Sequence, residues 1–145
     1  ALRISKELND LEAKKKALRS MGFNRWHQER YEDAASVLEE VLAIGSQTGH
    51  SQEVAGDLTS LGNVLRHQGK FDRALNCLEQ ALEIYESQAD PAKQCLTLYT
   101  ISSLHSHLGN DEKFLEYMER CYDVAKPRAK HDLSFVALWA ARLHQ

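Results

Sequence analysis

The stretch LTSLGNVLRHQGKFDRALNCL, residues 58–78, decides the fold. Its first part, residues 58–65, places apolar side chains and Gly62 at helical spacing on one face. After Gly69, which suits a helix C-terminus, a second helical pattern runs through residues 71–82. The stretch therefore predicts two helices joined by a tight turn, which makes them antiparallel neighbours.

The same order of residues recurs along the chain at a step of 40 residues. WHQERYEDA, residues 26–34, aligns with RHQGKFDRA, residues 66–74. Gly22 aligns with Gly62 and then with Ser102. A fixed step of this length indicates an array of similar helix pairs rather than a single irregular domain.

Small residues in this repeat predict where two helices approach each other closely. Gly22, Gly62 and Ser102 occupy the first helix of each pair, and Ala34 and Ala74 lie on the second helices. A large side chain in either column would hold the two helices apart. We therefore expect the glycine and alanine columns to face each other.

The middle unit contains Leu58-x2-Leu61-Gly62-x2-Leu65 and then Ala74-x3-Leu78. This order resembles the tetratricopeptide repeat pattern W-x2-L-G-x2-Y followed by A-x3-F. The longer period of 40 residues is similar to the long-repeat subclass of that family. The resemblance implies an all-α fold, a right-handed superhelical solenoid of antiparallel helix pairs.

We expect one array over residues 1–145. It would comprise the end of a preceding repeat's second helix (1–10), three repeats (11–50, 51–90 and 91–130), and the first helix of a following or capping repeat (131–145). Asp90 followed by Pro91 predicts a helix N-cap with proline in the first turn. Neither end has the polar outer face of a cap, which indicates a piece of a longer array and leaves self-association through the ends open.

Composition limits the function classes. The chain has 145 residues and a net charge of −3, which argues against a nucleic-acid binder. No apolar run approaches the roughly 20 residues of a membrane span, so we expect no membrane insertion. Three cysteines without CxxC spacing are typical of reduced thiols and predict a cytoplasmic protein.

Signals for catalysis or cofactors are missing from the sequence. It contains no GxSxG, GxxxxGK[ST], GxGxxG or HExxH motif, so we predict no enzyme and no cofactor. His27, His67 and His107 recur at the repeat step, but packed helices lie about 8–10 Å apart, too far for three histidines to share one zinc. A polar contact at a groove edge and a pH-sensitive contact both stay open for these histidines.

First helices line the concave side of a stacked array, so their outward residues predict a partner-binding groove. These residues are Arg19, Phe23, Trp26, His27, Thr59, Asn63, Arg66, His67, Tyr99, Ser103, Ser106 and His107. Aromatic residues and arginine are enriched at binding hot spots. The alternative for Phe23 and Trp26 is packing against a neighbouring repeat.

Charge predicts the kind of partner. Taken together, the predicted first helices contain more lysine and arginine than acidic residues, and the second helices contain fewer. Most of the positive charge comes from Lys14, Lys15, Lys16 and Arg19. This pattern favours an acidic or neutral peptide, although routine surface patterning is the alternative. We predict a protein–protein interaction scaffold; the second hypothesis is an effector-sensing domain of a larger signalling or transcriptional regulator.

Overall fold

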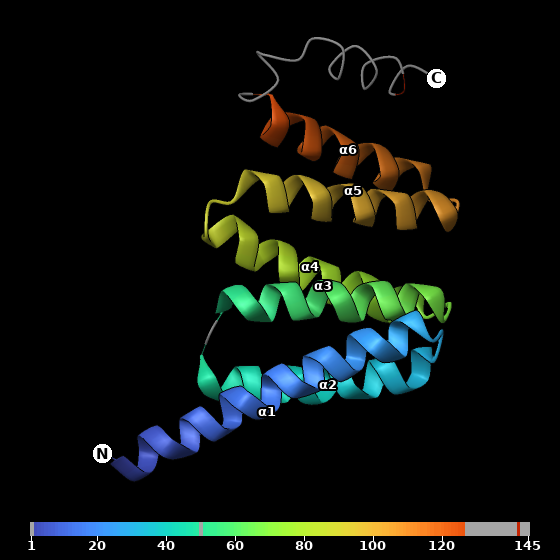
Figure 1. Ribbon diagram of the computed structural model, residues 1–145. Coiled ribbons are helices and arrows are strands. Elements are labelled where there is room, and N and C mark those ends of the chain that lie inside the picture. Colours follow the sequence, from blue (N-terminus) through green and yellow to red (C-terminus); the bar gives the residue numbers. More distant parts are fainter. Residues whose placement is uncertain (1, 50, 127–141, 143–145) are drawn as a thin grey trace. The chain divides into compact units, whose positions relative to one another are not determined.

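The computed structural model of the protein describes residues 2–49, 51–126 and 142. Over this part of the chain there are six α-helices and no strand, drawn in Figure 1. The all-α prediction is therefore confirmed. The chain forms two compact units, residues 1–84 and residues 85–145, and each is described by itself.

The first unit consists of helix pairs. Its helices are α1 (Leu2–His27), α2 (Tyr31–Thr48), α3 (Ser51–His67) and α4 (Phe71–Ser87), whose last three residues belong to the second unit. Helix α2 packs against both α1 and α3, and short turns reverse the chain between successive helices (Figure 1). The ion pair between Arg19 and Asp57 also joins α1 directly to α3.

The start of the chain differs from the expectation that residues 1–10 end a separate helix. In the structure residues 2–10 belong to α1, which runs without a break from Leu2 to His27 and extends beyond the end of α2 (Figure 1). The cause lies in the sequence, because no glycine or proline interrupts residues 2–20 and good helix formers predominate there. The division of the chain into repeats stays a prediction.

The contact between small residues and the partner helix is confirmed. A Cβ placed on Gly62 would lie 3.0 Å from Cγ of Leu78 and 3.3 Å from the carbonyl oxygen of Ala74. A Cβ on Gly22 would lie 3.4 Å from Leu38 in the same way. Glycine at these two positions therefore lets the two helices of the first and second pairs approach closely.

The core of the first unit lies between these helices. Its buried apolar residues are Ala34, Ala35, Leu38, Val41, Ile44, Ala55, Leu58, Leu61, Val64, Leu65, Ala74, Leu78, Ala81 and Leu82. Two charged residues, Lys15 and Asp57, are buried with them. The sequence pattern predicts most of the apolar set but neither buried charge.

Turns between the described helices share one backbone feature. Each contains a residue with positive φ, and these residues are Glu29, Gly49, Gly69, Ala89 and Gly109. Glycine adopts this left-handed conformation at little cost, whereas a side chain makes it unfavourable. Glu29 and Gly69, which are 40 residues apart, occupy the same place in the α1–α2 and α3–α4 turns, with φ of 58° and 78°.

The second unit contains α5 (Pro91–His107) and α6 (Asp111–Ala125), which pack against each other (Figure 1). Asp90 caps α5 by accepting a hydrogen bond from the Lys93 N–H at 3.2 Å, as predicted. Ser102, in the glycine column, donates to Sδ of Met118 at 3.2 Å. The predicted helix over residues 131–145 lies outside the described residues, apart from Arg142.

Candidate partner-binding site

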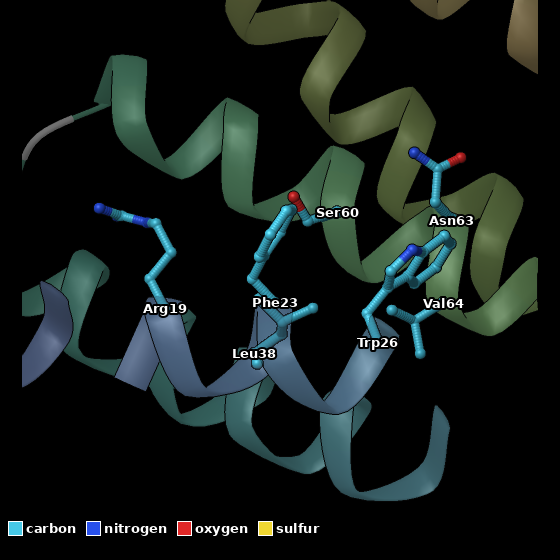
Figure 2. Close-up of a pocket in the computed structure, with 8 residues that line it drawn as sticks. Arg19, Phe23, Trp26, Leu38, Ser60, Asn63 and Val64 are labelled. Carbon is cyan, nitrogen blue, oxygen red and sulfur yellow. The ribbon is translucent and has the colours of Figure 1, made fainter. Parts of the chain in front are cut away.

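A hollow of about 300 Å³ lies in the first unit beside the contact between α1 and α3. Its lining residues are Arg19, Gly22, Phe23 and Trp26 from α1, Leu38 from α2, and Ser60, Asn63 and Val64 from α3. Figure 2 shows Phe23 and Trp26 reaching from α1 toward α3. Most of this wall is apolar, with one amide, one hydroxyl and one guanidinium at its edges.

Phe23 presents an aromatic ring to solvent at this hollow. Its exposed fraction is 63%, which is high for a phenylalanine. Its ring makes an edge-to-face contact with His27, with centroids 4.3 Å apart. An exposed aromatic ring beside an apolar hollow is typical of an anchor point for a partner.

Trp26 belongs to a different environment from Phe23. Its ring packs edge-on against His67 at 4.8 Å and against Tyr31 at 5.8 Å, measured between centroids. Tyr31 and His67 are stacked on each other at 5.3 Å. Trp26 therefore packs against the neighbouring repeat through His67 and also lines the hollow.

Two of the recurrent histidines, His27 and His67, pack against aromatic rings. His27 lies against Phe23, and His67 lies against Trp26 and Tyr31. Both are exposed at the ends of α1 and α3, where basic residues also interact favourably with the helix dipole. In the part of the chain that the structure describes, no group of three or more His, Cys, Asp or Glu residues could hold a metal ion.

Arg19 lines the hollow, but its guanidinium group forms an ion pair with a carboxylate of α3. Its Nε and Nη2 atoms donate to the two carboxylate oxygens of Asp57 on α3 at 2.8 and 2.9 Å. Nη2 also lies 3.7 Å from Glu53. The hydrogen bond with Asp57 raises the pKa of Arg19 and outweighs the opposing effect of burial.

Lys15 extends this network into the interior. It is 0% exposed, and its Nζ lies 2.7 Å from Glu53 and 2.9 Å from Glu12. Burial lowers the pKa of Lys15, but hydrogen bonds to these two carboxylates outweigh it and leave the pKa above its usual value. The lysine is therefore a buried cation that joins α1 to α3.

The predicted basic surface on α1 is largely neutralised by these contacts. Lys15 and Arg19 pair with acidic residues of α1 and α3, and Lys14 lies 3.6 Å from Glu40 on α2. Only Lys16 of the four cations remains exposed without a carboxylate partner among the described residues. These pairs reduce the positive charge available to a partner at this end of the chain, and the preference for an acidic or neutral peptide stays a prediction.

A second hollow, of about 230 Å³, lies in the second unit. Its lining residues are Tyr99, Ser102, Ser103, Ser106, Phe114, Met118 and Arg142. Tyr99, Ser103 and Ser106 occupy the same places in their repeat as Arg19, Phe23 and Trp26 in theirs. The two hollows are thus equivalent in position, but the second has hydroxyl groups where the first has aromatic rings.

The predicted site residues separate into three groups. Arg19, Phe23, Trp26 and Asn63 line the first hollow, and Tyr99, Ser103 and Ser106 line the second. His27, Thr59, Arg66, His67 and His107 line neither. Thr59 instead donates its hydroxyl to the carbonyl oxygen of Ala55 at 2.9 Å.

Two lining residues on α3, Ser60 and Val64, were missed by the sequence reasoning. The pattern assigned α3 one core face and one outward face, and these residues border both. Their signal was the spacing itself, since Asn63 and Val64 lie three and four residues after Ser60 on the same helix.

Comparison with known families agrees with this architecture. A family model described as tetratricopeptide repeat matches residues 16–87 and 58–127. No curated protein has a matching sequence. None of the described helices is long and apolar enough to cross a membrane.

Solved structures share the fold at low sequence identity. BtubC (BKLC) from P. vanneervenii has a TM-score of 0.72 at 18% identity, over 78% of this chain and 46% of its own. Aspartyl phosphate phosphatase F from Bacillus subtilis has a TM-score of 0.75 at 17% identity, over 87% of this chain and 32% of its own. The TPR domain of Arabidopsis FLU has a TM-score of 0.71 at 19% identity, over 84% of this chain and 99% of its own. The chain thus spans less than half the length of the first two, and the predicted helical-solenoid fold is confirmed.

Proposed function

The chain belongs to the tetratricopeptide repeat family, whose domains generally bind proteins or peptides, and we propose that it binds a partner peptide in the hollow between α1 and α3. The observation that supports this most directly is Phe23, an exposed ring on the wall of an apolar hollow. The hollow has room for one large apolar side chain of a partner.

The polar edge of the hollow suits a peptide as well. Asn63 and Ser60 lie on α3 and line the same hollow as Phe23 (Figure 2). An asparagine amide offers both donors and an acceptor, and a serine hydroxyl offers one donor and two acceptor lone pairs. An apolar anchor from the peptide would fill the hollow while its backbone approaches these polar groups.

A peptide-display selection on the purified chain tests the proposal. Peptides enriched on the wild type are measured by fluorescence anisotropy against Phe23→Asp, which places a charge at the hollow. Binding should weaken at least about tenfold, because a charge would replace a hot-spot ring. Phe23 is exposed, so the variant should keep its helicity and melting temperature.

The matched control is Leu8→Asp, an exposed apolar residue on the same helix that does not line the hollow. Its affinity for the selected peptides should equal that of the wild type. Peptides that bind Phe23→Asp as tightly as the wild type would place the binding site elsewhere and overturn the proposal.

A further inference from the structure

Among the described residues that line the first hollow, Arg19 is the only cation, and a buried carboxylate binds it. Arg19 presents its side chain to the hollow, and Asp57, which is 4% exposed, binds the guanidinium through both oxygens. The bidentate geometry uses Nε and one terminal nitrogen, which is the stronger mode of arginine–carboxylate pairing. A ligand carboxylate would have to compete with this internal partner.

The surrounding charges make that competition unfavourable. Arg19 and Lys15 are the cations of this network, and Glu12, Glu53 and Asp57 are its carboxylates. The network is therefore net negative next to the hollow. A second carboxylate brought close to Arg19 would meet like charges that are partly shielded from water, where repulsion is larger than in bulk solvent.

We infer that Asp57 is a specificity-determining residue, because it occupies the guanidinium of Arg19. The hollow then binds an uncharged aromatic or aliphatic side chain of the ligand, and it binds the same side chain more weakly when the ligand carries a carboxylate beside it. This inference rests on the proposed function and specifies the ligand class of the same site. Asp57 itself acts through Arg19 and does not line the hollow.

Two small probes of nearly the same shape test the inference. N-acetylphenylalaninamide is neutral, and N-acetylphenylalanine carries a carboxylate at neutral pH. Binding is followed at low ionic strength by the NMR signals of the Trp26 indole N–H and the Asn63 side-chain amide, both at the hollow. The chain has two tryptophans, so a Trp139→Phe background leaves Trp26 as the only indole.

The wild type should bind the amide more tightly than the acid. In Asp57→Asn the shape is kept and Arg19 is released, so the affinity of the acid relative to the amide should rise about threefold to fivefold, as expected for a half-exposed ion pair. The double variant Asp57→Asn/Arg19→Met removes the released cation and should return the ratio to the wild-type value. Glu39→Gln, which breaks the exposed pair with Arg73, is the matched charge control and should leave the ratio unchanged.

The outcomes separate this inference from the proposed function. If both probes shift the hollow's signals but Asp57→Asn keeps the wild-type ratio, the role of Asp57 is overturned and the hollow remains the site. A wild type that prefers the acid overturns it too. If neither probe shifts these signals, the hollow does not take an aromatic group, and the proposed function fails with the inference.

A second variant keeps the inference testable should Asp57→Asn fail to fold. The double variant Asp57→Asn/Arg19→Met removes the cation together with its carboxylate, so it leaves no unpaired charge at this position and keeps the net charge of the network. If Asp57 already masks the cation in the wild type, the ratio in this double variant should equal that of the wild type. A loss of acid binding relative to amide binding in this variant would mean that Arg19 is available to ligands, which overturns the inference.

Discussion

Gly62 on α3 lies so close to Leu78 on α4 that a Cβ at Gly62 would be 3.0 Å from Cγ of the leucine. Real Cβ atoms rarely approach a neighbour so closely, and the carbonyl oxygen of Ala74 blocks movement on another side at 3.3 Å. We expect Gly62→Ala to lower the free energy of unfolding by about 1–3 kcal/mol through overpacking, measured by urea denaturation.

The same helix provides the control for this prediction. Gly56 is also a glycine within α3, but a Cβ there would meet nothing within 4 Å. Gly56→Ala should therefore raise the free energy of unfolding by about 0.5–1 kcal/mol, because alanine loses less backbone entropy in a helix. Equal effects of the two substitutions would refute the close contact between α3 and α4.

Replacing Glu29 with glycine should raise the free energy of unfolding. Its φ of 58° is left-handed, while the equivalent turn residue Gly69 has φ of 78° without a side-chain penalty. We expect Glu29→Gly to stabilise the chain by about 0.5–1 kcal/mol after the entropic cost of glycine is counted. The reverse change, Gly69→Ala, should destabilise it by about 1 kcal/mol. Thermal denaturation checks both, and a destabilised Glu29→Gly would contradict the turn geometry.

Local features of the fold were predictable because each depends on a few neighbouring residues. The glycine column, the cap at Asp90 and the turn at Gly69 all follow from residue type and spacing. The length of α1 was missed because its alignment with second helices suggested a boundary near residue 10, yet nothing there stops a helix. Repeat alignment indicates ancestry, whereas helix ends depend on capping and breaking residues.

The electrostatics of the site were missed for a different reason. Sequence periodicity places Arg19 on the outward arc of its helix, but it does not show which side chain of the next repeat lies opposite. The ion pairs Lys15–Glu53 and Arg19–Asp57 both join residues 38 positions apart, two short of the repeat step. Opposite charges at that offset were the signal that could have revealed both contacts.

Trp26 and Phe23 should respond differently to truncation, although both line the hollow. Trp26 packs against Tyr31 and His67, so Trp26→Ala should lower the free energy of unfolding by about 1–2 kcal/mol, below the full cost for a buried aromatic residue. Phe23→Ala should change it by less than about 0.5 kcal/mol, because the ring is exposed. Chemical denaturation of the two variants measures the difference. A neutral Trp26→Ala would mean that the ring cluster does not stabilise the repeat pair.

Cys121 on α6 should make stability fall at alkaline pH. The residue is 1% exposed, and burial, with a smaller contribution from Cys95, raises its pKa from 9.0 to about 12. The unfolded thiol loses its proton at lower pH than the folded thiol. The contribution of the folded thiol to the free energy of unfolding is therefore fully present below about pH 9 and declines as the pH rises toward 12.

The variant Cys121→Ala has no thiol to titrate, but it also loses the packing of the sulfur atom at every pH. The stability advantage of the wild type over Cys121→Ala, measured by urea denaturation, should therefore narrow between pH 8 and pH 10.5, roughly the window set by the two pKa values. An advantage that stays constant over that range would show that the thiol titrates alike in the folded and unfolded states, which contradicts its burial between α5 and α6.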